Sequence, residues 1–208
     1  MREYTTTIYR FDELTPDAQW RAWENNNFNL AGDHSDEFLA TMAAFEDVFD
    51  IRVYRWSVDD WSYDYNFVAA GRAVECPEGD ALRVARYIWN NYASGISKGK
   101  YYGKLIWNGN KSRHVKRYSR ATFEMDNCPL TGVCYDYDIL QPVIDCLHYK
   151  RFFETFDDLI TACLDNFFAA WRNEIDYCNS FEYFAEIAEI NDWEFTENGD
   201  FWRGAVAV

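Results

Sequence analysis

The chain has 208 residues, 49% hydrophobic and 19% aromatic, so it can build an apolar core without disulfides or metals, which argues against an intrinsically disordered protein. It carries 35 acidic and 20 basic residues, a formal net charge of −15, so most of its surface should repel nucleic acid and attract basic proteins. No apolar run approaches the roughly 18 to 20 residues of a membrane span, and residues 1–5 lack a secretory signal pattern. We therefore expect a cytoplasmic protein without membrane contact.

The first 75 residues predict a mixture of strands and helices. Apolar residues at a spacing of three or four indicate helices, and alternating β-branched or aromatic residues indicate strands. In chain order we expect a strand over 5–10, a helix from Pro16 to about Asn25, a helix from Ser35 with Phe38, Met42, Phe45 and Val48/Phe49 on one face, and a hairpin of strands 51–58 and 62–69 around Asp59-Asp60.

The remainder predicts mainly helices. We expect a helix after Asp80 that stops before Ser94, with Leu82, Ala85, Ile88/Trp89 and Tyr92 on one face, and then a loop over 95–123 with one or two short strands. A short helix should follow through Leu140, Val143/Ile144 and Leu147, with Pro142 near its first turn, and then a long amphipathic helix from Phe156 to Cys178. The chain should end with a helix through Tyr183, Phe184, Ile187 and Ile190 and a hairpin over 194–202 that turns at Asn198-Gly199. Together these elements predict one α+β domain over residues 1–208, with about five or six helices packed on a mixed or antiparallel sheet.

Charge is distributed unevenly along the chain. Residues 81–123 contain ten bases and no acid, whereas residues 1–80 hold 17 acids and 6 bases and residues 124–208 hold 18 acids and 4 bases. Bases interleaved with aromatic residues are typical of single-stranded nucleic-acid binding, although here they could instead neutralise an acidic face of the same protein or of a second subunit. The candidate nucleic-acid-binding residues are Lys98, Lys100, Lys104, Lys111, Arg113, Lys116, Arg117 and Arg120.

Acidic residues fall mostly off the apolar stripes of the last two predicted helices. A row of carboxylates on rigid helices can imitate the phosphates of a nucleic acid and so bind a basic groove; the alternative is an ordinary solvated face. The candidate partner-binding residues are Glu154, Asp157, Asp158, Asp165, Glu174, Asp176, Glu182, Glu186 and Glu189.

Residues for catalysis or metal binding form no convincing site. Five residues separate Cys128 from Cys134, with His114 and His148 on either side, but zinc sites prefer closer pairs, so a compact turn with two buried thiols is favoured over a metal site. Neither a nucleophile elbow nor a phosphate-binding loop is present. The pairs Asp59-Asp60 and Asp157-Asp158 could hold a divalent ion in a nuclease, but a hairpin turn and a helix start are favoured. We therefore expect no enzyme and no cofactor, with free thiols at Cys76, Cys128, Cys134, Cys146, Cys163 and Cys178.

Three segments of the sequence resemble a broad group of small acidic proteins encoded by phages and prophages, often of unknown function and sometimes labelled antitoxins. They are residues 8–19 (IYRFDELTPDAQ), 127–136 (NCPLTGVCYD) and 194–199 (EFTENG), whereas the region 20–75 shows no likeness. The resemblance implies action in the cytoplasm of a host cell against a nucleic-acid-handling defence. It favours an anti-CRISPR or anti-restriction inhibitor that binds a basic host effector through an acidic surface. The alternative is a nucleic-acid-binding regulator or antitoxin that uses residues 98–120.

Overall fold

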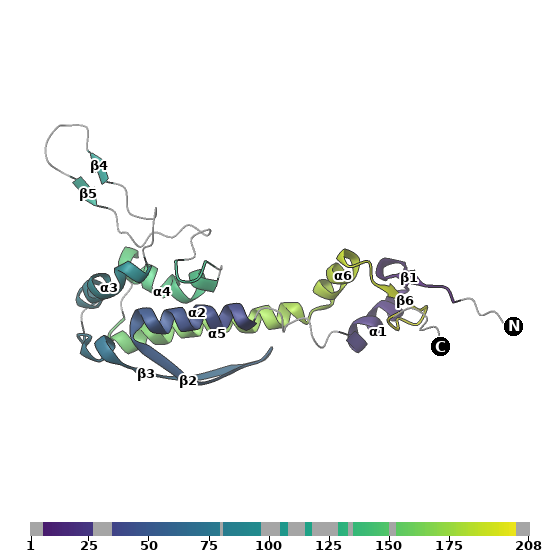
Figure 1. Cartoon of the computed structure of the whole chain (residues 1–208), viewed down its shortest axis with the longest axis horizontal. Helices are drawn as coiled ribbons and strands as arrows, with labels where there is room; N and C mark the ends of the chain where they lie inside the picture. The colour runs from purple at the N-terminus through teal and green to yellow at the C-terminus, as the bar shows by residue number, and fades with distance from the viewer. Residues whose placement is uncertain are drawn as a thin grey trace. The chain divides into compact units, whose positions relative to one another are not determined.

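The chain forms two compact units, each built from helices and short antiparallel strands. The computed structural model describes residues 6–26, 35–79, 81–96, 105–107, 115–117, 129–132, 135–149 and 153–202, and gives 105–107 and 115–117 as backbone only. Unit 1 comprises residues 1–35 and 173–208, and unit 2 comprises residues 36–172. Across the described ranges there are six α-helices and three separate two-stranded antiparallel sheets, which confirms the expected α+β class (Figure 1). A single domain over residues 1–208 stays a prediction. Within these ranges, no helix has the length and apolarity that crossing a membrane requires.

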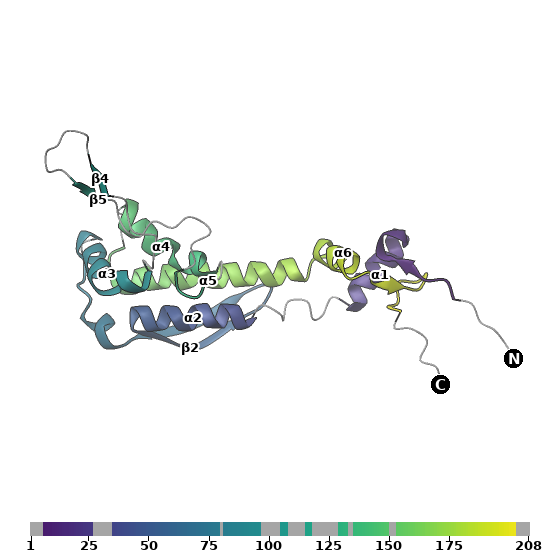
Figure 2. The same cartoon turned by 45° about the horizontal axis from the view of Figure 1, so that its top comes forward.

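Unit 2 is centred on the helix α5, which runs from Phe156 to Cys178 as the sequence predicts and leaves the unit after Arg172. Its apolar stripe is buried at Leu159, Ile160, Cys163, Leu164, Phe167, Phe168 and Trp171. The helix α2 (Ser35–Phe49) lies alongside α5 in both views of the molecule (Figures 1 and 2). The ring of Phe38 in α2 stacks on Trp171 at 4.9 Å between centroids, so the expected apolar face of α2 packs into this core.

A β-hairpin in unit 2 packs on the same helix. Its strands are β2 (Ile51–Val58) and β3 (Tyr63–Ala69), which pair antiparallel as expected. Tyr65 of β3 stacks on Phe168 of α5 at 5.1 Å between ring centroids. At the turn, the Asp59 carboxylate accepts hydrogen bonds from the backbone N–H groups of Trp61 (2.8 Å) and Ser62 (2.6 Å). These backbone bonds lower the pKa of Asp59 and close the turn, which is the structural role that we expected for Asp59-Asp60.

The helix α3 (Ala81–Ile96) confirms the predicted element but corrects its buried face and its end. Leu82 was expected inside and is 44% exposed, because the buried row runs through neighbouring positions instead. Helical spacing back from Ile88 passes through Val84 and Ala81, so Leu82 is turned toward solvent. The helix also continues past Ser94, where the sequence indicated its end. In the 95–123 segment, β4 (Leu105–Trp107) pairs antiparallel with β5 (Val115–Arg117), in line with the short strands expected there.

The helix α4 (Tyr135–Tyr149) is longer than predicted, and Pro142 lies in its interior rather than near its first turn. Its start is explained by Asp136, which is fully buried. The Asp136 carboxylate accepts hydrogen bonds from the backbone N–H groups of Leu130 (2.7 Å), Thr131 (2.7 Å) and Gly132 (3.2 Å). It also accepts from the hydroxyls of Thr131 (2.8 Å) and of Thr41 in α2 (3.2 Å). This clasp satisfies a buried charge and begins the helix at Tyr135, a signal that apolar spacing alone does not carry.

The predicted turn at Cys128 and Cys134 falls partly outside the described residues, because only residues 129–132 of it are described and neither cysteine is. His114 and His148 have no described side chain. Among the cysteines within the described ranges, Cys76, Cys146, Cys163 and Cys178 are free thiols, as expected.

Unit 1 joins the two ends of the chain around one small core. The N-terminal segment contributes β1 (Tyr9–Arg10), the short 3-10 helix η1 (Phe11–Glu13) and α1 (Pro16–Asn26), and the C-terminal segment contributes α6 (Phe181–Ile190) and β6 (Glu194–Phe195). β1 pairs antiparallel with β6, and Tyr9 lies opposite Phe195. The buried cluster consists of Phe11, Leu14, Ala18, Ala22, Phe184, Ala188 and Phe195. Residues at opposite ends of the sequence therefore depend on one another for burial.

The predicted Asn198-Gly199 turn closes the C-terminal hairpin and also touches α1. Gly199 has a φ of +89°, and its backbone N–H donates to the carbonyl of Thr196 at 2.9 Å. A Cβ at this position would lie 2.2 Å from the carbonyl oxygen of Ala18. Only glycine fits, both because of the left-handed conformation and because α1 approaches so closely.

Candidate protein-binding surface

The surface of unit 1 carries a dense excess of carboxylates. Its described residues include 13 acids and only two bases, Arg10 and Arg21, and residues 173–202 contain no base at all. Glu174 is half-buried and the other twelve acids are exposed. The exposed set is Asp12, Glu13, Asp17, Glu24, Asp176, Glu182, Glu186, Glu189, Asp192, Glu194, Glu197 and Asp200. A small unit with this composition presents a strongly negative field to solvent.

Three of these acids stand in a row on α6. Glu182, Glu186 and Glu189 follow at intervals of four and three residues, so they share one exposed side of the helix. At a rise of about 1.5 Å per residue they are spaced about 6 Å and about 4.5 Å along the axis. Phosphates follow one another about every 3.4 Å along the axis of one DNA strand, so the row is a looser array of the same order.

The backbone that carries the row is fixed at the start of the helix. The Ser180 hydroxyl accepts a hydrogen bond from the backbone N–H of Tyr183 at 3.1 Å and so caps the start of α6. The indole N–H of Trp23 in α1 donates to the carbonyl of Asn179 at 3.0 Å, just before the helix. Because Phe184 and Ala188 are buried in the core of unit 1, the opposite side of α6 must face solvent. The carboxylates are therefore displayed on a positioned helix.

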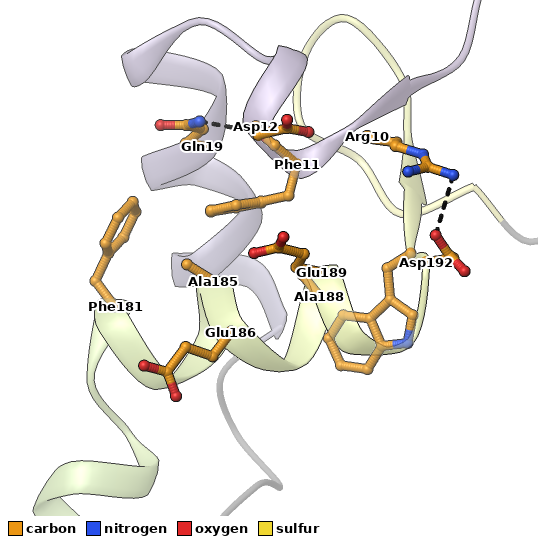
Figure 3. A pocket seen from close by; sticks show the side chains of 11 residues that line it. Arg10, Phe11, Asp12, Gln19, Phe181, Ala185, Glu186, Ala188, Glu189 and Asp192 are labelled. Atoms are coloured by element: carbon orange, nitrogen blue, oxygen red, sulfur yellow. Dashed lines mark hydrogen bonds and ion pairs between the residues drawn. The ribbon is translucent and has the colours of Figure 1, made fainter.

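A pocket of about 320 Å³ lies between η1 and α6 (Figure 3). Its floor is aromatic and includes Phe11, Phe181 and Trp193, with 5.7 Å between the ring centroids of Phe11 and Phe181. The lining also includes the carboxylates of Asp12, Glu186, Glu189 and Asp192, all of them exposed. The hollow thus combines an apolar base with a negatively charged edge, an arrangement suited to a cation with an apolar stem.

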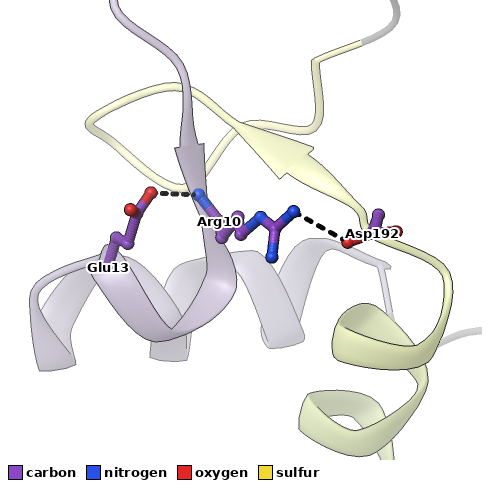
Figure 4. A network of polar contacts seen from close by, with 3 residues as sticks. All are labelled: Arg10, Glu13 and Asp192. Carbon is purple, nitrogen blue, oxygen red and sulfur yellow. Dashed lines mark hydrogen bonds and ion pairs between the residues drawn. The ribbon is translucent and has the colours of Figure 1, made fainter.

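A short polar network fixes one side of this pocket (Figure 4). The guanidinium of Arg10 lies 3.1 Å from the carboxylate of Asp192, and the backbone N–H of Arg10 donates to the carboxylate of Glu13 at 2.8 Å. The side-chain amide of Gln19 donates to the carbonyl of Phe11 at 2.9 Å. The ion pair is well exposed, so it contributes at most about 1 kcal/mol to stability. The main effect of this ion pair is to hold two segments in place, because it joins the start of η1 to the turn after α6.

The structure divides the nine predicted partner-binding acids between the two units. Unit 1 holds Glu174, Asp176, Glu182, Glu186 and Glu189, and unit 2 holds Glu154, Asp157, Asp158 and Asp165. Their function as a binding surface stays a prediction.

Two of the unit 2 acids have structural partners, although all four are exposed. The carboxylate of Asp158 accepts from the backbone N–H of Thr155 at 3.0 Å, and the Thr155 hydroxyl accepts from the N–H of Asp158 at 3.1 Å, a capping box that starts α5. The carboxylate of Asp165 accepts from the Tyr65 hydroxyl at 2.7 Å. Burial, followed by this contact, raises the pKa of Tyr65. Asp158 and Asp165 therefore have structural roles, which leaves Glu154 and Asp157 as the unit 2 candidates beside the twelve exposed acids of unit 1.

Only four of the twelve exposed acids of unit 1 were named from the sequence, and the other eight were missed. Asp12 and Asp192 line the same pocket although 180 residues separate them in the chain. The only sequence signal is the absence of bases from residues 173–202, because nothing local indicates that the N-terminal segment packs against them.

The basic candidate residues lie almost wholly outside the described residues. This applies to Lys98, Lys100, Lys104, Lys111, Arg113 and Arg120, while Lys116 and Arg117 are described only as backbone in β5. Their role in nucleic-acid binding stays a prediction. Within the ranges that the structure describes, no group of three or more His, Cys, Asp or Glu residues is arranged to hold a metal ion.

Comparison with protein-family models, curated proteins and solved structures finds no match to this chain.

Proposed function

We propose that this protein is a non-enzymatic binding protein of the cytoplasm whose acidic unit 1 occupies a basic, nucleic-acid-binding surface of another protein. The observation that carries the proposal is the set of twelve exposed carboxylates set against two arginines in the described part of unit 1. Complementary charge of this kind speeds association and selects basic partners over neutral or acidic ones.

Aromatic side chains beside the carboxylates supply the apolar contact that charge alone lacks. Trp20 on α1 is 51% exposed, and its ring stacks on Phe181 of α6 at 6.0 Å between centroids and lies 4.7 Å from Trp23. Tryptophan is the residue type most enriched where interfaces concentrate their binding energy. A partner groove that normally stacks bases between phosphate contacts would find both kinds of group on unit 1.

The biological role that we propose is inhibition of a host defence effector, such as a CRISPR effector or a restriction enzyme. The resemblance of three segments to acidic phage proteins supports this role. By occupying the basic channel, unit 1 would compete with the nucleic acid that the effector must bind, and no chemical step by this protein is needed. Inhibition would therefore be stoichiometric and reversible.

The proposal is tested with a purified CRISPR effector loaded with guide RNA, immobilised and titrated with this protein from about 0.05 M to about 0.5 M NaCl. Affinity should fall steeply with salt, and target DNA should displace the protein. Binding that ignores salt, or that persists when guide and target strands fill the channel, would contradict the proposal. A gel shift with labelled single-stranded DNA runs in parallel, and a shift by the protein alone would favour the regulator alternative instead.

A matched pair of variants locates the binding surface. One variant replaces the α6 row (Glu182→Gln, Glu186→Gln, Glu189→Gln), and the control replaces three exposed acids of unit 2 (Asp47→Asn, Glu75→Gln, Glu78→Gln). Both remove three negative charges, so they differ only in place. If each lost contact costs about 0.5 kcal/mol, the α6 variant should bind about tenfold more weakly than the control. Equal affinities would exclude α6 from the interface.

A further inference from the structure

We infer that the pocket between η1 and α6 is a receptor for one arginine side chain of the partner protein. This inference rests on the proposed function, because it names the partner group that unit 1 recognises. It goes further in one respect: a uniform acidic surface would accept any cation, whereas a shaped pocket discriminates between arginine and lysine.

The shape of the pocket favours a side chain that is apolar along its stem and charged at its tip. Phe11 and Phe181 form the base from opposite sides, one carried by η1 and the other by the first turn of α6 (Figure 3). Its volume of about 320 Å³ is at the lower end of small-ligand sites, which suits a single side chain rather than a larger molecule. The methylene stem of an arginine would cover these rings and leave its guanidinium at the edge.

The edge offers unengaged acceptors. Over the described residues, the side-chain carboxylates of Asp12 and Glu189 have no hydrogen-bond or ion-pair partner, and that of Glu186 accepts only a long bond of 3.3 Å from the Tyr177 hydroxyl. A guanidinium has five N–H donors in a plane and can engage two carboxylates while stacking on an aromatic ring. An ammonium group also has several donors and forms cation–π contacts, but it has no plane that stacks on a ring and no fork that matches a carboxylate bidentately, so the aromatic base favours arginine over lysine.

A guanidinium group of the protein itself is already paired with a carboxylate in this pocket. Arg10 lines the pocket, and its guanidinium pairs with Asp192 at 3.1 Å. One guanidinium is therefore held at this wall while three further carboxylates of the lining remain for another. The incoming arginine would meet a lining whose formal charges are four negative and one positive.

The experiment titrates the full-length protein with oligo-arginine and oligo-lysine peptides of equal length and charge, by calorimetry at low salt. We expect the arginine peptide to bind about tenfold more tightly, the difference that one charge-assisted bidentate contact provides. Three variants separate the pocket from the general field. Asp12→Asn with Glu189→Gln removes two pocket charges, Glu194→Gln with Glu197→Gln removes two exposed charges outside the pocket, and Ala185→Leu fills the pocket without changing charge.

The preference for arginine should disappear in the pocket double variant and in Ala185→Leu, and should survive in the Glu194/Glu197 control. Wild-type binding of both peptides with equal affinity would overturn the arginine pocket while leaving the acidic binding surface intact. Failure of wild type to bind either peptide at low salt would overturn the proposed function itself. A thermal melt of each variant is the control for folding. If Ala185→Leu melts at a lower temperature, its loss of preference does not count as support. The Asp12→Asn, Glu189→Gln variant then decides, because both of its substituted residues are exposed.

Discussion

The Asp136 clasp makes a sharp prediction about stability. Replacing Asp136 by Ala removes the acceptor of five hydrogen bonds at once, three from backbone N–H groups and two from hydroxyls. The cost of losing this acceptor differs between the donors. Thr131 and Gly132 are exposed and Leu130 is half-buried, so their N–H groups can turn to water, whereas the hydroxyl of Thr41 is fully buried.

The expected loss follows from these contacts. A hydrogen bond to a charged group contributes about 1.5 to 3 kcal/mol net when buried and less where water can replace the partner. Counting one bond of the buried kind and reduced values for the exposed ones, the Asp136→Ala variant should lose about 3 to 5 kcal/mol of its free energy of unfolding. Thr41→Val keeps the shape of the side chain and should lose about 1 kcal/mol, because it removes one hydroxyl from the same network.

Urea unfolding followed by tryptophan fluorescence measures these losses. Asp47→Ala on α2 is the control, since this exposed acid should change the free energy of unfolding by no more than about 0.5 kcal/mol. A loss for Asp136→Ala that is indistinguishable from that of Asp47→Ala would refute the claim that the clasp anchors α4 to α2.

Three further predictions concern single positions. Gly199→Ala should destabilise unit 1 by more than about 2 kcal/mol, seen as a lower melting temperature, because the new Cβ would collide with the carbonyl of Ala18; an unchanged melt would mean that the turn relaxes freely. Burial, with a smaller contribution from Asp157, raises the pKa of Cys76 to about 11. At pH 8, alkylation of Cys76 measured by peptide mapping should therefore be roughly a hundredfold slower in the folded protein than in urea, and its rate should increase toward pH 11. An equal rate in the folded protein and in urea would contradict this. Backbone hydrogen bonds lower the pKa of Asp59, so they stabilise the hairpin at a pH above the ordinary pKa of 3.8, and this stabilisation is lost as the pH falls through the pKa of the folded state. In an NMR titration the Asp59 carboxyl should have its midpoint below 3.8. A midpoint at or above 3.8 would show that the turn is open.

The elements that the sequence predicts well are those whose burial follows a regular spacing. Phe38, Met42, Phe45 and Phe49 of α2 are buried as predicted, and α5 has the predicted bounds. Such helices bury one continuous stripe, and the stripe is visible in the order of residues. The hairpin turn at Asp59 was equally local, because the carboxylate bonds to N–H groups only two and three residues further on.

The errors come from interactions that are not local or not apolar. α4 begins at Tyr135 because a buried carboxylate gathers the N–H groups of a preceding turn, and apolar spacing cannot show that bond. The error on α3 has a different cause: the buried row runs through Ala81, Val84 and Ile88, so helical spacing leaves Leu82 exposed although it is more hydrophobic than Ala81.

For the same reason, only part of the candidate site could be predicted from the sequence. The acidic character of α6 was evident from Glu182, Glu186 and Glu189. The pocket was not, because it needs Asp12 and Phe11 from the other end of the chain, placed by the pairing of β1 with β6. Long-range pairing of two-residue strands leaves almost no trace in local sequence.

The most direct test of the central claim is hydrogen exchange on this protein, free and bound to the guide-loaded effector. We expect new protection in residues 9–26 and 173–202, the segments that build unit 1, and loss of that protection when target DNA fills the effector. Protection confined to unit 2 or to residues 98–120, with unit 1 exchanging as in the free protein, would contradict the claim.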